Sequence, residues 1–125
     1  MDIDLSEFSA PQQQAFFELL ILAMYADGHL ATVEDEFLQK LLESMGYKEP
    51  FERQRELDAA VTQIRPCIQS LAKAKELALS LADGFTTRQQ QRKVYAAVER
   101  MMASDGHVTV WEGMLLSELR LKFRV

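Results

Sequence analysis

The chain contains a single cysteine, Cys67, among its 125 residues. A disulfide within the chain is therefore excluded, and we expect a reducing compartment such as the cytoplasm. A chain of this length can still bury about two-thirds of the surface that it exposes when unfolded. We expect it to fold as one domain around an apolar core, without a disulfide or a metal ion.

The sequence also lacks the segments that direct a chain to or through a membrane. Its first seven residues include three acidic residues and no basic one, so we expect no secretory signal. The longest apolar run, residues 15–26, is interrupted by Glu18 and is shorter than the roughly 20 residues of a membrane-spanning helix. We expect no membrane span and interpret this run as a buried helix.

Positive charge is in short supply, with 14 Lys and Arg against 19 Asp and Glu and a net charge of −5. Residues 1–62 hold 13 acidic and 4 basic side chains (−9), and residues 63–125 hold 6 and 10 (+4). The overall acidity argues against nucleic acid as the main partner, while the unequal halves could attract each other within the fold or in a dimer. We expect a solvated helix face from the basic side chains of Arg88, Arg92, Lys93 and Arg100.

Glycine and proline are scarce, at five and three residues, and no segment alternates between apolar and polar residues for long enough to form a strand. Helical spacing dominates, so we predict an all-α, compact single-domain bundle of about six or seven helices. Three helices open with Thr followed three residues later by Asp, Gln or Glu, at Thr32, Thr86 and Thr109. Caps, glycines and prolines place the helices at about residues 9–26, 32–45, 50–65, 67–82, 86–103 and 109–123.

The chain contains one short phrase twice: an Asp-Gly-His turn followed by a Glu seven residues after the Asp. The two copies are Asp27-Gly28-His29-Leu30 with Glu34, and Asp105-Gly106-His107-Val108 with Glu112. Apolar residues match on both sides of the turn, since Phe16, Phe17, Leu20, Ala23 and Met24 align with Val94, Tyr95, Val98, Met101 and Met102, and Phe37, Leu38 and Leu41 with Leu115, Leu116 and Leu119. We predict an internal pseudo-twofold repeat with units at about 11–45 and 87–123 and a helical insert at about 47–86.

The spacing of the phrase equals that of the second half of an EF-hand calcium loop. The first half of that loop lacks carboxylates here, because ligand positions one and three would be Ala23 and Tyr25 in the first copy and Met101 and Ala103 in the second. One Asp, one Glu and a backbone carbonyl cannot supply the roughly six to eight oxygens that calcium takes. The sequence therefore argues against an ordinary EF-hand in either copy.

Helix capping explains part of the phrase. Gly28 and Gly106 can end helices in the left-handed conformation, and each Asp can accept hydrogen bonds from the backbone of its turn. Glu112 can complete a capping box with Thr109. The pair Asp83-Gly84 supports this interpretation, because it ends a predicted helix and has no Glu seven residues further on.

Capping does not explain Glu34, because Thr32 and Asp35 can cap that helix by themselves. If the two copies face each other, the turns bring together four carboxylates, which would bind a divalent cation or have raised pKa values. The candidate metal ligands are Asp27, Glu34, Asp105 and Glu112. We expect His29 and His107 to face solvent or a partner; if they pointed inwards instead, the mixed nitrogen and oxygen set would favour zinc or another transition metal.

These residues resemble the TerB-like family, named for tellurite resistance. The first copy, with Ala26 before the Asp-Gly pair, matches closely, whereas the second has Ser104 where Ala is usual. The resemblance covers nearly the whole chain. It implies a bacterial, mostly cytoplasmic, all-helical domain linked to stress responses, with a suspected divalent-metal site at the four acidic residues and no established enzymatic activity. Nothing in the sequence points to tellurite itself.

The sequence contains no glycine-rich phosphate loop, H-E-x-x-H, C-x-x-C or triad pattern, so we predict no enzymatic activity. One alternative is a protein-interaction or dimerisation module in which the acidic turns only cap helices. An exposed apolar face involving Trp111, Met114 or Tyr47 would then bind a protein partner or a second copy. A hydrolase built on the carboxylates would need a deep pocket with a strongly perturbed Asp or Glu.

Overall fold

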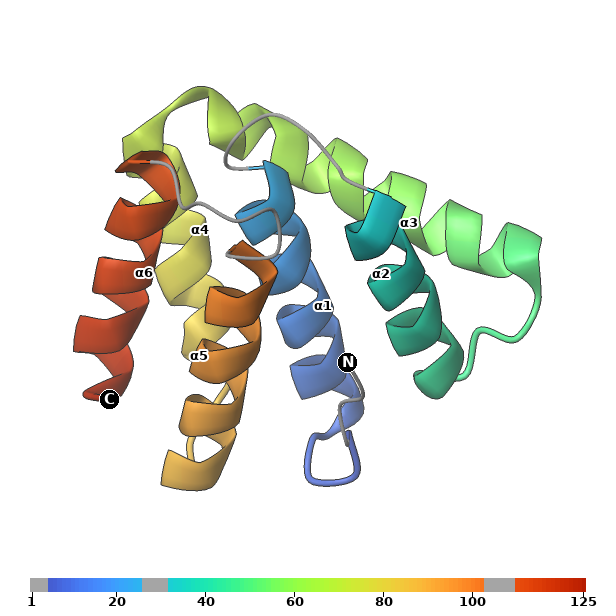
Figure 1. Cartoon of the computed structure of the whole chain (residues 1–125), viewed down its shortest axis with the longest axis horizontal. Helices are drawn as coiled ribbons and strands as arrows, with labels where there is room; N and C mark the ends of the chain where they lie inside the picture. Colours follow the sequence, from blue (N-terminus) through green and yellow to red (C-terminus); the bar gives the residue numbers. More distant parts are fainter. Residues whose placement is uncertain (1–4, 26–31, 103–109) are drawn as a thin grey trace.

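Six α-helices and one short 3-10 segment make up most of the described chain (Figure 1). This computed structural model describes residues 5–25, 32–102 and 110–125, and at positions 24, 25, 32–35, 111 and 112 it describes the backbone alone. No strand occurs within these ranges, which confirms the predicted all-α bundle. The helices are α1 (Ala10–Tyr25), α2 (Thr32–Ser44), α3 (Pro50–Ile64), α4 (Leu71–Ala82), α5 (Arg88–Met102) and α6 (Val110–Phe123), with the 3-10 segment at Arg65–Gln69.

Helix α1 lies in the middle of the bundle because it is apolar around nearly its whole circumference. Phe16, Phe17 and residues 19–23 are all at most 2% exposed. Helices α2, α3, α4 and α5 all pack against α1. Burying one large apolar side chain contributes about 1.5–3 kcal/mol relative to leaving it exposed, so α1 supplies a large share of the stability of the core. The predicted buried helix is confirmed.

Helices α1 and α5 lie side by side and run in the same direction, and each is followed by a helix that runs back (Figure 1). Helix α2 follows α1 and packs against it, as α6 does with α5. Some matched positions of the two hairpins are buried alike: Phe16 and Val94 are both fully buried, and Leu20 and Val98 are at most 1% exposed. Others differ, since Phe17 is buried and its counterpart Tyr95 is only partly buried. Helices α3 and α4 connect the two hairpins, and the internal repeat stays a prediction.

Helix α1 opens at the capping residue that the sequence indicates. The backbone N–H of Gln12 donates to Oγ of Ser9 (3.3 Å), and the N–H of Ser9 donates to Oε1 of Gln12 (2.9 Å). These two bonds form a reciprocal capping box. The Gln12 side chain also donates from Nε2 to the carbonyl of Gly84 (2.9 Å), which ties the start of α1 to the turn before α5.

The fourth helix begins later than predicted. Cys67 lies in the 3-10 segment that follows α3, and Ser70 then adopts an extended backbone conformation (φ −140°, ψ 132°). The side chain of Ser70 accepts a hydrogen bond from the backbone N–H of Lys73 (3.4 Å), so Ser70 is the N-cap and the helix starts at Leu71. An α-helix that begins at residue 67 is therefore wrong.

The cap of α5 also differs from the prediction. The backbone N–H of Gln90 donates to Oγ1 of Thr87 (3.1 Å), so Thr87 caps the helix and the predicted Thr86 cap is wrong. The Gln90 side chain is only 8% exposed and donates from Nε2 to the carbonyl of Glu7 (2.8 Å). Placing the cap one residue later turns Gln90 inwards, where its buried amide holds the segment before α1.

Lys93 is the exception to the predicted solvated face. Its Nζ lies 2.9 Å from Oε1 of Glu7 and 5.8 Å from the centroid of the Phe8 ring, within cation–π range. Phe8 is itself buried, with its ring centroid 5.4 Å from that of Phe85. The expectation of a solvated face is thus wrong for Lys93, which is half-buried and paired, and right for the exposed Arg92 and Arg100. Arg88 is exposed but donates from Nη1 to the carbonyl of Phe123 (2.9 Å).

Gly46 and Gly113 differ in backbone conformation, since one ends a helix and the other lies inside one. Gly46 ends α2 in the left-handed region (φ 109°), and the N–H of Tyr47 beyond it donates to the carbonyl of Leu42 (3.0 Å). A side chain at Gly46 would be strained, because L-residues rarely adopt this conformation. Gly113 lies inside α6, and a Cβ atom there would meet no other atom within 4 Å.

Alanine at these two glycines should change stability in opposite directions. We expect Gly46→Ala to lower the free energy of unfolding by about 1 kcal/mol, because Ala pays the cost of the left-handed conformation. Gly113→Ala should raise the free energy of unfolding by about 0.5–1 kcal/mol, because Ala is the better helix former. Urea unfolding followed by circular dichroism measures both changes, and a change of the same sign in the two variants would contradict this account.

Candidate metal centre at the end of the bundle

Two of the four predicted metal ligands lie outside the described residues. These are Asp27 and Asp105, and the same holds for His29 and His107. Glu34 and Glu112 lie in the first turns of α2 and α6, where the backbone is described. Helices α1 and α2 flank the first copy of the phrase, and helices α5 and α6 flank the second.

Helices α1 and α5 both end at one end of the bundle, and α2 and α6 both begin there (Figure 1). The starts of α2 and α6 lie on opposite sides of the α1–α5 pair. Helix α1 packs against α5 and α2, and α5 packs against α6. The two copies of the phrase are thus attached to neighbouring helices that run in the same direction.

Positions 34 and 112 lie on the core-facing sides of their helices. Residues three, four and seven positions apart share one side of an α-helix. The residues at these spacings after each Glu pack in the core: Phe37, Leu38 and Leu41 in α2, and Leu115, Leu116 and Leu119 in α6. Each Glu therefore occupies the first position of a core-facing stripe, at the end of the bundle where the four helix ends lie.

The backbone dipoles at this end of the bundle largely offset one another. The ends of α1 and α5 each carry about −0.5 of a charge, and the starts of α2 and α6 each carry about +0.5. The local electrostatic field then depends mainly on the ionised carboxylates of the two copies of the phrase. A cation is the charge that such a set of carboxylates favours.

No second candidate metal site appears in the described part of the chain. Within residues 5–25, 32–102 and 110–125, the described side chains of Asp, Glu, His and Cys form no group of three or more that could hold a metal ion.

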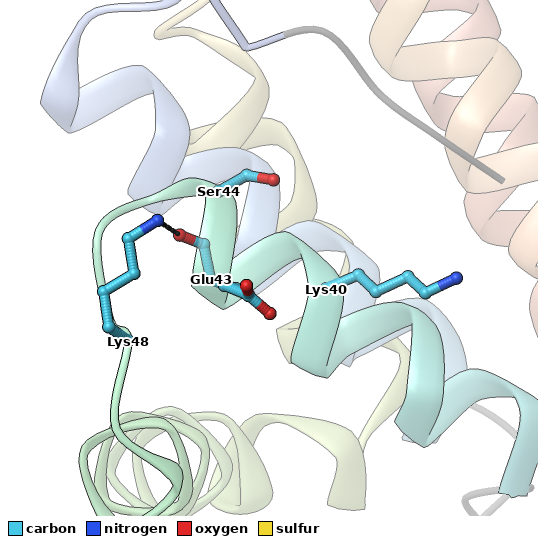
Figure 2. Close-up of a pocket in the computed structure, with 4 residues that line it drawn as sticks. All are labelled: Lys40, Glu43, Ser44 and Lys48. Carbon is cyan, nitrogen blue, oxygen red and sulfur yellow. Dashed lines mark hydrogen bonds between the residues drawn. The ribbon is translucent and has the colours of Figure 1, made fainter.

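A shallow depression of about 270 Å³ lies near the C-terminal end of α2, lined by Lys40, Glu43, Ser44 and Lys48 (Figure 2). Nζ of Lys48 donates to the backbone carbonyl of Glu43 (3.3 Å), which helps to cap α2. The Lys40 side chain extends away from Lys48, and all four residues are exposed. Because these groups do not converge, we assign no ligand to the depression.

Burial raises the pKa of Glu18 above its ordinary value of 4.5, and a hydrogen bond with the Gln14 side chain partly opposes this effect. Glu18 lies seven residues before the end of α1, which corresponds to about 10 Å along the helix axis. It is therefore separate from the four helix ends. Its half-buried carboxyl group is explained by the apolar surroundings of α1.

Replacing Glu18 should stabilise the fold in a pH-dependent way. Because its folded-state pKa is raised, the stability contribution is fully present below pH 4.5 and is lost as the pH rises through the folded-state pKa. We expect Glu18→Gln to raise the melting temperature at about pH 7 and to leave it unchanged at about pH 3. Thermal unfolding across this range tests the prediction, with the exposed Glu76→Gln as the matched control; an equal shift at both pH values would refute it.

The residues predicted for an exposed apolar face differ in how exposed their side chains are. Met114 is 43% exposed, whereas Tyr47 is half-buried against the core and the Trp111 side chain lies outside the described part. Sequence reasoning missed Val110 and Leu121 on the same helix, which are 78% and 74% exposed. A helical projection through Met114 would have found both, because all three share one side of α6.

No protein-family model matches the chain, and searches of curated proteins and of solved structures find no significant match. Among the described helices, none is both long and apolar enough to cross a membrane. The function is therefore inferred from the residues of the chain itself.

Proposed function

We propose that the chain is a non-enzymatic TerB-like stress-response domain in which Asp27, Glu34, Asp105 and Glu112 together bind one divalent cation. The observation that supports this proposal is the parallel packing of α1 and α5, which end at the same end of the bundle (Figure 1). Each of these helices leads into one copy of the phrase. Two incomplete half-sites are thus attached to neighbouring helix ends.

The chemistry of the cation requires both copies. Four carboxylates that each bind through one or two oxygens supply roughly four to eight ligands, the range that Ca²⁺ takes and that Mg²⁺ or Mn²⁺ complete with water. One copy alone supplies half of this number. This explains why Glu34 is present although Thr32 with Asp35 can cap α2 without it; Glu112 can in addition complete a capping box with Thr109.

Binding should also be coupled to folding. The four acidic residues are distant in the sequence, so the unfolded chain does not hold them together as a site. A cation that binds only the folded state stabilises it by mass action. A metal that occupies the site must therefore raise the melting temperature as well as produce heat on binding.

Calorimetric titration with Ca²⁺, Mg²⁺, Mn²⁺ and Zn²⁺ tests this proposal. We expect saturable binding of at least one metal, weakened about tenfold or more by Glu34→Gln and by Asp105→Asn, since each removes one ligand. Asp83→Asn is the matched control, because Asp83 belongs to an Asp-Gly pair that ends α4 without a Glu seven residues later. This control removes the ion pair with Lys122 but should bind the metal as the unmodified chain does.

The absence of binding heat with all four metals, with no rise in melting temperature, would overturn the cation proposal. So would equal loss of binding in the Asp83→Asn control.

A second candidate function, a protein-interaction or dimerisation module whose acidic turns only cap helices, is favoured by the exposure of Met114. It predicts that no metal binds and that the apolar face of α6 is covered in solution. Light scattering distinguishes a second copy from another partner: a dimer has twice the monomer mass of 14.3 kDa. A monomeric mass would refute dimerisation.

A further inference from the structure

Helix α6 carries an apolar stripe on the side that faces away from the bundle. The stripe comprises Val110, Met114 and Leu121, which are 78%, 43% and 74% exposed, with the exposed Ser117 between them. Their spacings of four, three and four residues place them on one side of the helix, over about 17 Å. Helix α6 packs against α4 and α5 and lies at one edge of the bundle (Figure 1). The described helices leave this stripe uncovered.

The surface of the stripe is open enough for another helix to approach. Gly113 lies beside Met114, and a Cβ atom at Gly113 would meet no other atom within 4 Å. Ser117 is also small and exposed. A partner can therefore place a large apolar side chain over Ser117, between Met114 and Leu121, and another beside Gly113 at the flank of the stripe.

One edge of the stripe is positively charged. Arg120 is exposed and follows Gly113 at helical spacing, and the exposed Arg124 comes directly after the end of α6 with a left-handed backbone (φ 57°). Nε of Arg120 donates to the carbonyl of Val125 (3.1 Å), and among the described residues neither arginine forms an ion pair with a carboxylate. The nearby carboxylates are engaged elsewhere, since Glu118 pairs with Lys75 (3.5 Å) and Asp83 pairs with Lys122.

The charge along this edge argues against a second copy as the occupant. In a pair of α6 helices from two copies, Arg120 would meet no free carboxylate among the described side chains of the other α6, because Glu118 pairs with Lys75 (3.5 Å).

We propose that the outer face of α6 binds an acidic amphipathic helix of another protein. The partner's apolar side chains, spaced three and four residues apart, pack over Val110, Met114 and Leu121, and its Asp or Glu residues pair with Arg120 and Arg124. The stripe lies on the side of α6 opposite to position 112. Binding here is therefore independent of the cation proposal, and failure of either leaves the other intact.

Fluorescence anisotropy with a synthetic peptide tests this inference. The probe is a labelled helical peptide of about 14 residues with Leu at spacings of four, three and four and with Glu on its flanks, and the matched probe has Lys in place of every Glu. We expect the acidic peptide to bind at least about tenfold more tightly than the Lys peptide. The difference should shrink as the salt concentration rises from about 0.05 to 0.5 M.

Surface variants locate the contact. Leu121→Ser should weaken binding of the acidic peptide by about tenfold, and the double variant Arg120→Glu with Arg124→Glu should reverse the preference in favour of the Lys peptide. Phe51→Ser is the matched control, because Phe51 is 67% exposed on α3 and should have no effect. Circular dichroism confirms that each variant folds.

Several results would overturn the inference. They are equal binding of the two peptides, no binding at about 0.2 mM, or a loss of binding in Phe51→Ser as large as in Leu121→Ser. A doubled mass in light scattering that Leu121→Ser abolishes would identify a second copy instead. Sedimentation with phosphatidylserine vesicles that depends on Leu121, without peptide binding, would identify an anionic lipid surface instead.

Discussion

The rest of the structure depends on the burial of α1 on almost every side. A helix with Phe16, Phe17 and residues 19–23 all buried cannot lie on a surface, so it requires neighbours around it, and α2, α3, α4 and α5 provide them. That requirement brings α5 directly beside α1, in the same direction (Figure 1). The apolar core thereby fixes where both acidic turns are attached. The position of the proposed cation site therefore follows from the packing of α1 against α5, at a distance from the site itself.

Much of the fold could be predicted from the sequence, because strong local signals agree with one another. Pro50 opens α3, the Ser9–Gln12 box opens α1 and Gly46 ends α2, each through one local interaction. The errors arise where neighbouring residues offer competing caps. Ser70 captures the start of α4, and Thr87 replaces Thr86 because the buried Gln90 side chain has a distant partner in the carbonyl of Glu7. A contact across 83 residues is not visible in local spacing.

For the candidate site, the two copies of the phrase and the position of each Glu could be read from the sequence, whereas the packing of the helices that lead into them could not. That packing of α1 on α5 is a tertiary contact between residues far apart in the chain. The outer stripe was only partly anticipated, because α6 is apolar on two opposite sides. Leu115, Leu119 and Phe123 face the core and Val110, Met114 and Leu121 do not, and helical spacing alone does not say which set is buried. One helix thus presents position 112 inwards and a docking face outwards.

The central claim is that both turns hold the same ion, and paramagnetic broadening by Mn²⁺ in nuclear magnetic resonance spectra tests it most directly. A single bound Mn²⁺ broadens nearby amide signals steeply with distance, so it reports on both turns at once. The account predicts that signals from the last turn of α1 and the last turn of α5 broaden together, at the same Mn²⁺ concentration and with one ion per chain. Broadening at only one of these helix ends, or at neither, would contradict it.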